Sequence, residues 1–187
     1  MELNAEISRL EKEIDARKKE LAELRRKVPP QDVTDYTFAT PAGDVRLSEL
    51  FAGKPDLLVV HNMGRKCPYC TLWADGFNGV LPHLENRTAF VVSSPDAPAV
   101  QTEFAAGRGW KFRMVSVQAS AFAKEMGFQS ERGGYLPGVS SFRKTADGKV
   151  QRIAHTYFGP GDDFCSVWHF FDLLADGVNE WEAQFKY

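Results

Sequence analysis

Residues 57–84 read LLVVHNMGRKCPYCTLWADGFNGVLPHL, and this stretch decides the fold. The run Leu57–His61 is apolar and partly β-branched, which predicts a buried strand. Residues 67–84 follow a helical pattern. Two cysteines, Cys67 and Cys70, therefore stand at the start of a helix that comes directly after a buried strand. This arrangement is typical of a redox site.

Strands alternate with helices along most of the chain. The apolar patterns predict further strands at residues 38–40, 45–47, 89–93, 112–117, 139–143 and 150–156, and further helices at residues 97–106, 119–126 and 165–176. Alternation of this kind, followed by a hairpin and a last helix, predicts an α/β fold with a mixed central sheet and helices on both faces.

The first 28 residues have a different pattern, a heptad repeat. Position a holds Ile7, Ile14, Leu21 and Val28, and position d holds Leu3, Leu10, Arg17 and Leu24. β-Branched residues at a with leucine at d favour two parallel helices. In this register Glu13 at g would face Lys18 at e of a second copy, and Glu20 would face Arg25. The pattern predicts an amphipathic helix over residues 1–28 that either forms a homodimer or docks on its own domain.

Two consecutive prolines, Pro29 and Pro30, end the predicted helix, because proline lacks the backbone N–H and restricts the residue before it. Residues 29–35 are expected to form a linker. The alternating pattern begins after them, so residues 36–187 are predicted to be one domain. Its length suits a single hydrophobic core.

Composition excludes several classes of function. The chain has 187 residues, with 23 lysines and arginines against 25 aspartates and glutamates, and a pI of about 6.1. Proteins that bind nucleic acid usually carry a basic excess, so no nucleic acid partner is expected. The apolar runs are too short to span a membrane. The charged N-terminus lacks the apolar region of a secretion signal, so we expect a cytoplasmic protein.

The tetrad Cys67-Pro68-Tyr69-Cys70 carries the predicted chemistry. Pro68 suits the first helical position, where its missing N–H costs nothing. The sulfur of Cys67 would then lie over the free N–H groups of the first turn, which favour a thiolate. Such settings lower a cysteine pKa from about 8.5 to about 3.5–7.5. Cys67 is therefore predicted to be the nucleophile, and Cys70 the resolving thiol.

Two other readings of the pair stay open. A zinc site also uses paired cysteines, but it needs two further ligands. Only the third cysteine, Cys165, and four histidines remain, and none of them forms a second close pair. The two cysteines could also be structural. Cys165 itself is expected to be a buried free thiol.

Several segments resemble known families. The stretch TPAGDVRLSELFAGKPDLLVV, residues 40–60, resembles the opening of redoxins, the branch that holds peroxiredoxins and thiol-disulfide reductases. The CPYC tetrad is identical to that of glutaredoxins. The strings RKCPYCTLWADGFNGVLPHL, RGWKFRMVS, PGVSSF and HTYFGPG resemble a bacterial thioredoxin-like family of unknown function. This resemblance covers residues 36–187 and implies a thioredoxin-like fold with a thiol-disulfide site.

The resemblance also implies where a substrate would bind. Reductases of this fold place a cis-proline loop opposite the cysteines, and here that loop falls on Pro137, Val139 and Ser140. The usual proline position falls on Val139 or Ser140, so either Pro137 serves through a shifted loop or the motif is absent. Around the cysteines, Arg65, Lys66, Pro68 and Tyr69 are the other expected substrate contacts.

Two further residues are candidates for moving protons. Asp75 lies on the predicted helix after Cys70 and could accept its proton. His61 lies at the end of the central strand, six residues before Cys67, and could tune the thiolate. A solvated aspartate and a structural histidine are the alternative interpretations of these two residues.

The sequence thus predicts a thiol-disulfide oxidoreductase that needs no cofactor or metal, because the two sulfurs carry the electrons. Its expected partners are a protein or small-molecule disulfide and an electron donor of the thioredoxin or glutathione type. The alternatives are a thioredoxin-fold binding protein without turnover, a structural zinc protein and a peroxidase. The sequence lacks the Pro-x-x-x-Thr/Ser-x-x-Cys pattern of peroxiredoxins before either Cys67 or Cys70, which disfavours a peroxidase.

Overall fold

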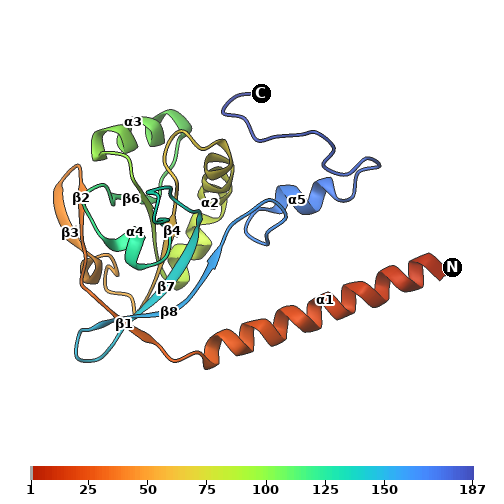
Figure 1. Cartoon of the computed structure of the whole chain (residues 1–187), viewed down its shortest axis with the longest axis horizontal. Coiled ribbons are helices and arrows are strands. Elements are labelled where there is room, and N and C mark those ends of the chain that lie inside the picture. The colour runs from red at the N-terminus through yellow and green to blue at the C-terminus, as the bar shows by residue number, and fades with distance from the viewer. Residues whose placement is uncertain (1) are drawn as a thin grey trace.

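A computed structural model describes residues 2–187, and its centre is an eight-stranded mixed sheet (Figure 1). The strands are β1 (Gln31–Val33), β2 (Thr37–Thr40), β3 (Gly43–Arg46), β4 (Asp56–His61), β5 (Ala89–Ser94), β6 (Arg113–Ser116), β7 (Gly138–Lys144) and β8 (Val150–Tyr157), in the spatial order β1-β8-β7-β4-β5-β6-β2-β3. Strands β4, β5 and β6 run parallel, and the other neighbours pair antiparallel. The predicted mixed α/β sheet is confirmed.

Helices cover both faces of this sheet, as predicted. On one face lie α2 (Pro68–Arg87), α3 (Pro98–Arg108) and α5 (Ser166–Phe171), and on the other lie the 3-10 turn η1 (Leu47–Glu49) and α4 (Phe122–Glu125). The long helix α1 (Glu2–Lys27) extends away from the sheet (Figure 1). In the described part of the chain, no helix is both long and apolar enough to cross a membrane.

Strand β4 divides the core in two because its side chains alternate between the faces. Leu57 and Val59 join the cluster that contains Phe122 on the α4 side. Val60 joins the cluster that contains Trp73 on the α2 side. The cysteines belong to this second cluster. The strand that leads into the tetrad is therefore held in place from both sides.

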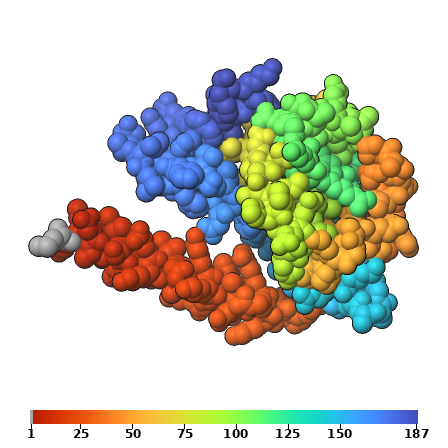
Figure 2. Space-filling view, turned by 180° about the vertical axis from the view of Figure 1, so that it is seen from behind, coloured from red at the N-terminus to blue at the C-terminus, as the bar shows by residue number. Residues whose placement is uncertain are grey.

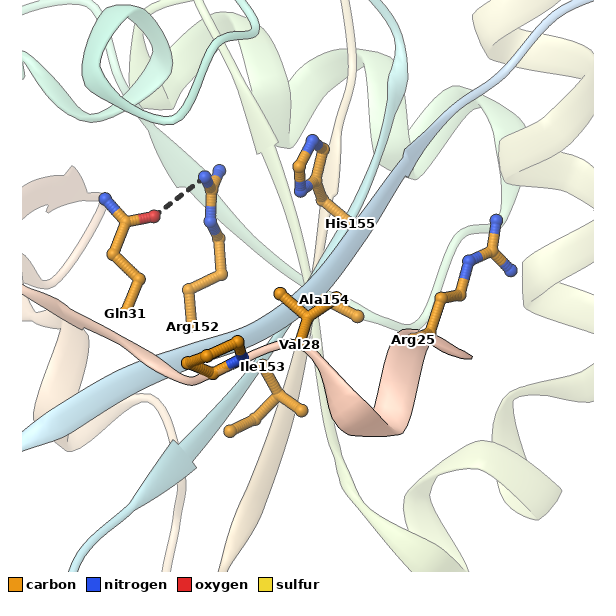
Figure 3. Close-up of a pocket in the computed structure, with 8 residues that line it drawn as sticks. Arg25, Val28, Gln31, Arg152, Ile153, Ala154 and His155 are labelled. Carbon is orange, nitrogen blue, oxygen red and sulfur yellow. Dashed lines mark hydrogen bonds between the residues drawn. The ribbon is translucent and has the colours of Figure 1, made fainter. Parts of the chain in front are cut away.

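Part of the expected linker is a strand. Residues Gln31–Val33 pair antiparallel with the outer edge of β8. Polar side chains support this pairing: Arg152 donates to Gln31 at 2.9 Å (Figure 3), and Gln151 donates to Asp32 at 2.7 Å. Three residues are too few to show an alternating apolar pattern, so the sequence did not indicate this strand.

The last helix is shorter than predicted. It was expected over residues 165–176, but α5 ends at Phe171 and turns follow. Only Trp168 of this helix is buried, whereas Phe170 is 66% exposed and Leu174 is 57% exposed. The apolar residues beyond the first turn do not reach the core, so packing does not extend the helix.

A substitution of Gly138, at the start of β7, can test how tightly the sheet is packed. A Cβ atom at Gly138 would lie 2.3 Å from the carbonyl oxygen of Thr156 and 2.4 Å from the ring of Phe128. We expect Gly138→Ala to lower the free energy of unfolding by about 1–3 kcal/mol, because backbone and ring must both move. Urea unfolding followed by tryptophan fluorescence measures this change.

A matched control lies on α2. Gly79 is exposed, and a Cβ atom there would have no neighbour within 4 Å. Gly79→Ala should raise the free energy of unfolding by about 0.5–1 kcal/mol, since alanine loses less backbone entropy in a helix. Equal effects of the two substitutions would contradict the packing argument at Gly138.

Candidate functional site

The site lies in the segment between β4 and α2 and in the first turn of α2. Pro68 is the first residue of α2, and Cys67 caps the helix with an extended backbone. The sulfur of Cys67 accepts a hydrogen bond from the backbone N–H of Cys70 at 3.0 Å. That N–H is one of the free donors of the first turn, and its use by a sulfur is the arrangement expected from the tetrad.

The two thiols have opposite properties. A hydrogen bond from the Cys70 side chain, opposed by partial burial and aided by the backbone N–H groups of Cys70 and Tyr69, lowers the pKa of Cys67 to about 7. The hydrogen bond to Cys67, burial and the charge of the Cys67 thiolate raise the pKa of Cys70. Cys67 is half-buried and Cys70 is only 3% exposed. The geometry therefore favours Cys67 as the attacking sulfur.

The two cations beside the tetrad do not account for the lowered pKa of Cys67. Arg65 and Lys66 are exposed, and neither is among the causes of the lowered pKa of Cys67. Solvent screens charges at exposed positions, whereas the N–H groups point directly at the sulfur. Hydrogen bonds, rather than the flanking charges, hold the thiolate.

The loop between β4 and Cys67 is clamped by residues that sequence reasoning missed. The backbone N–H of Arg65 donates to the carboxylate of Asp96 at 2.7 Å, and the hydroxyl of Ser94 donates to the same oxygen at 3.0 Å. The N–H of Gly64 donates to the side-chain oxygen of Asn62 at 2.7 Å. Gly64 has a φ of +99°, which glycine adopts readily.

A signal for Asp96 was present in the sequence. It follows the end of β5, which pairs in parallel with β4. The carboxyl ends of parallel strands meet at the same edge of a sheet, which is where binding residues gather in α/β folds. Polar residues just after β5 were therefore candidates for the environment of Cys67.

Aromatic residues from the C-terminal segment cover the first turns of α2. The ring of Trp168 stacks on Tyr69 with centroids 6.0 Å apart, and Phe158 packs on Trp73 at 5.5 Å. Cys165 is buried in the same cluster, and burial raises its pKa. The prediction of a buried free thiol at Cys165 is confirmed. Pro68 and Tyr69 remain half-buried beside Cys67.

Neither proton-relay candidate lies in contact with the thiols. The carboxylate of Asp75 forms an ion pair with Arg108 and accepts a hydrogen bond from the indole of Trp110 at 2.7 Å. His61 lies on the opposite face of the sheet, where its ring stacks on Phe128 at 3.6 Å. Burial first, and then the nearby Arg152 and His155 charges, hold its pKa well below the usual value. His61 is a neutral structural residue.

The predicted substrate loop divides between the two faces of the sheet. Val139 packs in the cluster that contains Cys67. Ser140 is fully buried on the other face, with its Oγ 2.9 Å from Nε2 of His61, so it offers no surface to a substrate. Adjacent residues of a strand point to opposite faces, which explains the difference.

The cis-proline motif is absent. All peptide bonds in residues 2–187 are trans, including the one before Pro137. The carbonyl of Pro137 accepts a hydrogen bond from the N–H of Phe158 at 2.9 Å, which ties this loop to the segment after β8. Within the same residues, no group of three or more His, Cys, Asp and Glu side chains is placed to hold a metal ion.

Sequence comparison connects this site to a family. Residues 3–187 match the family described as "Bacterial protein of unknown function (DUF899)". The chain belongs to this family. Comparison of the sequence with curated proteins gives no match.

Solved structures with the fold of this DUF899 protein include several peroxiredoxins. Peroxidoxin BcpB from Mycobacterium tuberculosis superposes with a TM-score of 0.55 at 22% identity, covering 68% of this chain and 84% of that one. Reduced Prx3 from Vibrio vulnificus gives 0.56 at 16% identity, covering 71% and 88%. A peroxiredoxin-like protein from Aquifex aeolicus gives 0.53 at 14%, covering 68% and 74%. At these identities the likeness shows a thioredoxin-like fold.

The pKa of Cys67 can be measured directly. Only the thiolate reacts with iodoacetamide, so alkylation of the reduced protein should be slow below pH 7 and half-maximal near pH 7. Mass spectrometry of peptides should find the label on Cys67 and not on Cys70 or Cys165 in the folded state. Cys67→Ser is the control. A midpoint near pH 9 would contradict the assignment.

The clamp by Asp96 can be tested by removing its carboxylate. Asp96→Ala leaves the N–H of Arg65 and the hydroxyl of Ser94 without their acceptor, so we expect a loss of about 1–3 kcal/mol in the free energy of unfolding. Asp44→Ala, at an exposed position of β3, should change it by less than about 0.5 kcal/mol. If the two variants unfold alike in urea, the carboxylate does not hold the loop.

Proposed function

We propose that this protein is a thiol-disulfide oxidoreductase in which Cys67 attacks and Cys70 resolves. The observation that carries the proposal is the hydrogen bond from the N–H of Cys70 to the sulfur of Cys67, at 3.0 Å, with Cys70 buried behind it. Together with a hydrogen bond from the Cys70 thiol, it lowers the pKa of Cys67 to about 7, while the hydrogen bond to Cys67 and burial raise the pKa of Cys70.

The reaction balances without a cofactor. The Cys67 thiolate forms a bond to one sulfur of the substrate disulfide and releases the other sulfur as a thiolate. Cys70 then gives up its proton and attacks the sulfur of Cys67, which releases the second substrate thiol. The protein dithiol is oxidised to a disulfide, and two electrons pass to the substrate.

The charge on Cys67 controls the second step. In the reduced protein that charge helps to raise the pKa of Cys70. Once Cys67 is joined to the substrate it is neutral, so this contribution disappears and the Cys70 thiol becomes easier to deprotonate. The resolving thiol is therefore activated by formation of the mixed disulfide itself, and the reaction needs no proton relay through Asp75 or His61.

The surface beside Cys67 would receive the substrate. Pro68, Tyr69 and Val139 are partly buried around it and offer apolar contacts. Arg65 and Lys66 are exposed next to it and offer positive charge. A cytoplasmic setting, in which thioredoxin and glutathione keep thiols reduced, would return electrons to the pair. Its reduction potential should then lie roughly between −270 and −180 mV.

A peroxidase is the second candidate, and the similarity of fold to peroxidoxin BcpB and Prx3 favours it. The Cys67 thiolate would attack the terminal oxygen of a hydroperoxide, giving a sulfenic acid and an alcohol or water. Cys70 would condense with the sulfenic acid to form the same disulfide and release water. Against this candidate, the residues before Cys67 lack the peroxidatic pattern.

Cysteine variants test the proposal. Reduced protein is mixed with a model disulfide, with a thioredoxin or glutathione system to supply electrons, and NADPH consumption is followed. Cys70→Ser should stop turnover and accumulate a mixed disulfide on Cys67, seen as added mass in the intact protein. Cys67→Ser should stop turnover with no adduct. Cys165→Ser is the matched control and should retain turnover, because Cys165 is buried outside the pair.

Three outcomes would contradict the oxidoreductase proposal. Turnover that survives Cys67→Ser would remove its nucleophile. Consumption of hydrogen peroxide or an organic hydroperoxide, with no reduction of disulfides, would favour the peroxidase. A protein that forms no mixed disulfide in the Cys70→Ser variant and consumes neither substrate would be a binding protein without turnover.

A further inference from the structure

Helix α1 presents an apolar face that the rest of its own chain does not cover. None of its 26 residues is buried. The side chains at positions a and d are between 44% and 79% exposed, and they are Leu3, Ile7, Leu10, Ile14, Leu21, Leu24 and, just past the helix, Val28. Figure 2 shows the N-terminal part of α1 projecting from the body of the molecule. An exposed apolar stripe of this length marks an interaction surface.

The helix contacts its own domain through residues at the edge of this stripe. Lys18 forms an ion pair with Asp163 at 2.6 Å, and Arg25 donates to the hydroxyl of Thr156 at 3.4 Å. In Figure 3 the Arg25 side chain extends away from Val28, which lies beside β8. Lys18 and Arg25 are both at position e. The contacts to the domain therefore leave the stripe at a and d open.

We propose that this face binds α1 of a second copy of the chain, forming a parallel two-stranded coiled coil. Isoleucine and leucine at position a, with leucine at d, are compatible with this geometry. In this register Glu13 would face Lys18 of the second copy, and Glu20 would face Arg25, so the two cations would share their present contacts to Asp163 and Thr156 with these carboxylates. One pair opposes this pattern, because Glu6 would face Glu11.

The one charged residue within the stripe is already compensated. Arg17 occupies position d, and its guanidinium donates to the carboxylate of Glu20 at 2.8 Å on the same helix. Glu20 lies at g, on the rim of the proposed interface. The long side chain of Arg17 can pack its methylenes against the partner while its charge stays at the rim in water.

The end of α1 suits a parallel pair. Pro29 and Pro30 follow the helix and lead directly into β1, which is fixed on the edge of β8. In a parallel pair both catalytic domains lie at the same end, and the projecting parts of the two helices are free to meet along their whole length. The dimer would therefore hold two cysteine sites at the same end of the coiled coil.

The mass of the full-length protein in solution tests the pairing. Light scattering should give twice the 21.0 kDa of one chain, and Ile14→Glu should give a single chain. Lys12→Glu, at the exposed position f, is the matched control and should leave the dimer intact. Because Ile14 is not buried in the chain, its variant should keep the unfolding midpoint of the domain and the alkylation of Cys67.

Crosslinking tests the orientation. In a background with all three native cysteines changed to serine, Leu10→Cys should form a disulfide between copies on oxidation, since equivalent d positions meet in a parallel pair. Lys12→Cys should not. A single-chain mass at every concentration, a dimer that survives Ile14→Glu, or a dimer in which Leu10→Cys fails to crosslink would each overturn the proposal. None of these results depends on the redox activity.

Discussion

The hydrogen bond from the backbone N–H of Cys70 to the sulfur of Cys67 organises this protein's site. It exists because Pro68 begins α2 and leaves the donors of the first turn free. It is aimed correctly because β4 is buried between β5 and β7, so the chain leaves the sheet at a fixed point. Asp96 and Asn62 then hold the six-residue segment between strand and helix. The strand, the loop and the helix start together place the sulfur of Cys67 beside the N–H of Cys70.

The same contact separates the roles of two identical side chains. Two cysteines in one turn have the same chemistry in an unfolded chain, and only their surroundings distinguish them. A hydrogen bond from the Cys70 thiol and the backbone N–H groups of Cys70 and Tyr69 favour charge on Cys67, whereas the hydrogen bond to Cys67, burial and the neighbouring thiolate oppose charge on Cys70. In the proposed reaction, the order of the two chemical steps would follow from where the helix begins.

The parts of the fold that could be predicted are those with local causes. The apolar run before the tetrad, the proline at the helix start and the hairpin at Thr145 each carry their signal within a few residues. What could not be predicted depends on contacts between distant segments. Asp96 can hydrogen-bond the loop before Cys67 only because β5 lies beside β4. Ser140 is inaccessible to a substrate because the register of β7 places its side chain on the same face as His61.

The two faces of the sheet explain why the loop of Pro137 departs from the expected motif. At the start of β7, the ring of Phe128 and the backbone of Thr156 and Tyr157 lie so close to residue 138 that a Cβ atom there would clash. The backbone there pairs with β8, and the carbonyl of Pro137 accepts a hydrogen bond from the N–H of Phe158. Val139 packs in the cluster that contains the cysteines, together with aromatic residues of the C-terminal segment. A substrate at Cys67 would therefore meet side chains rather than a free backbone edge, which favours recognition by apolar shape and by the charges of Arg65 and Lys66.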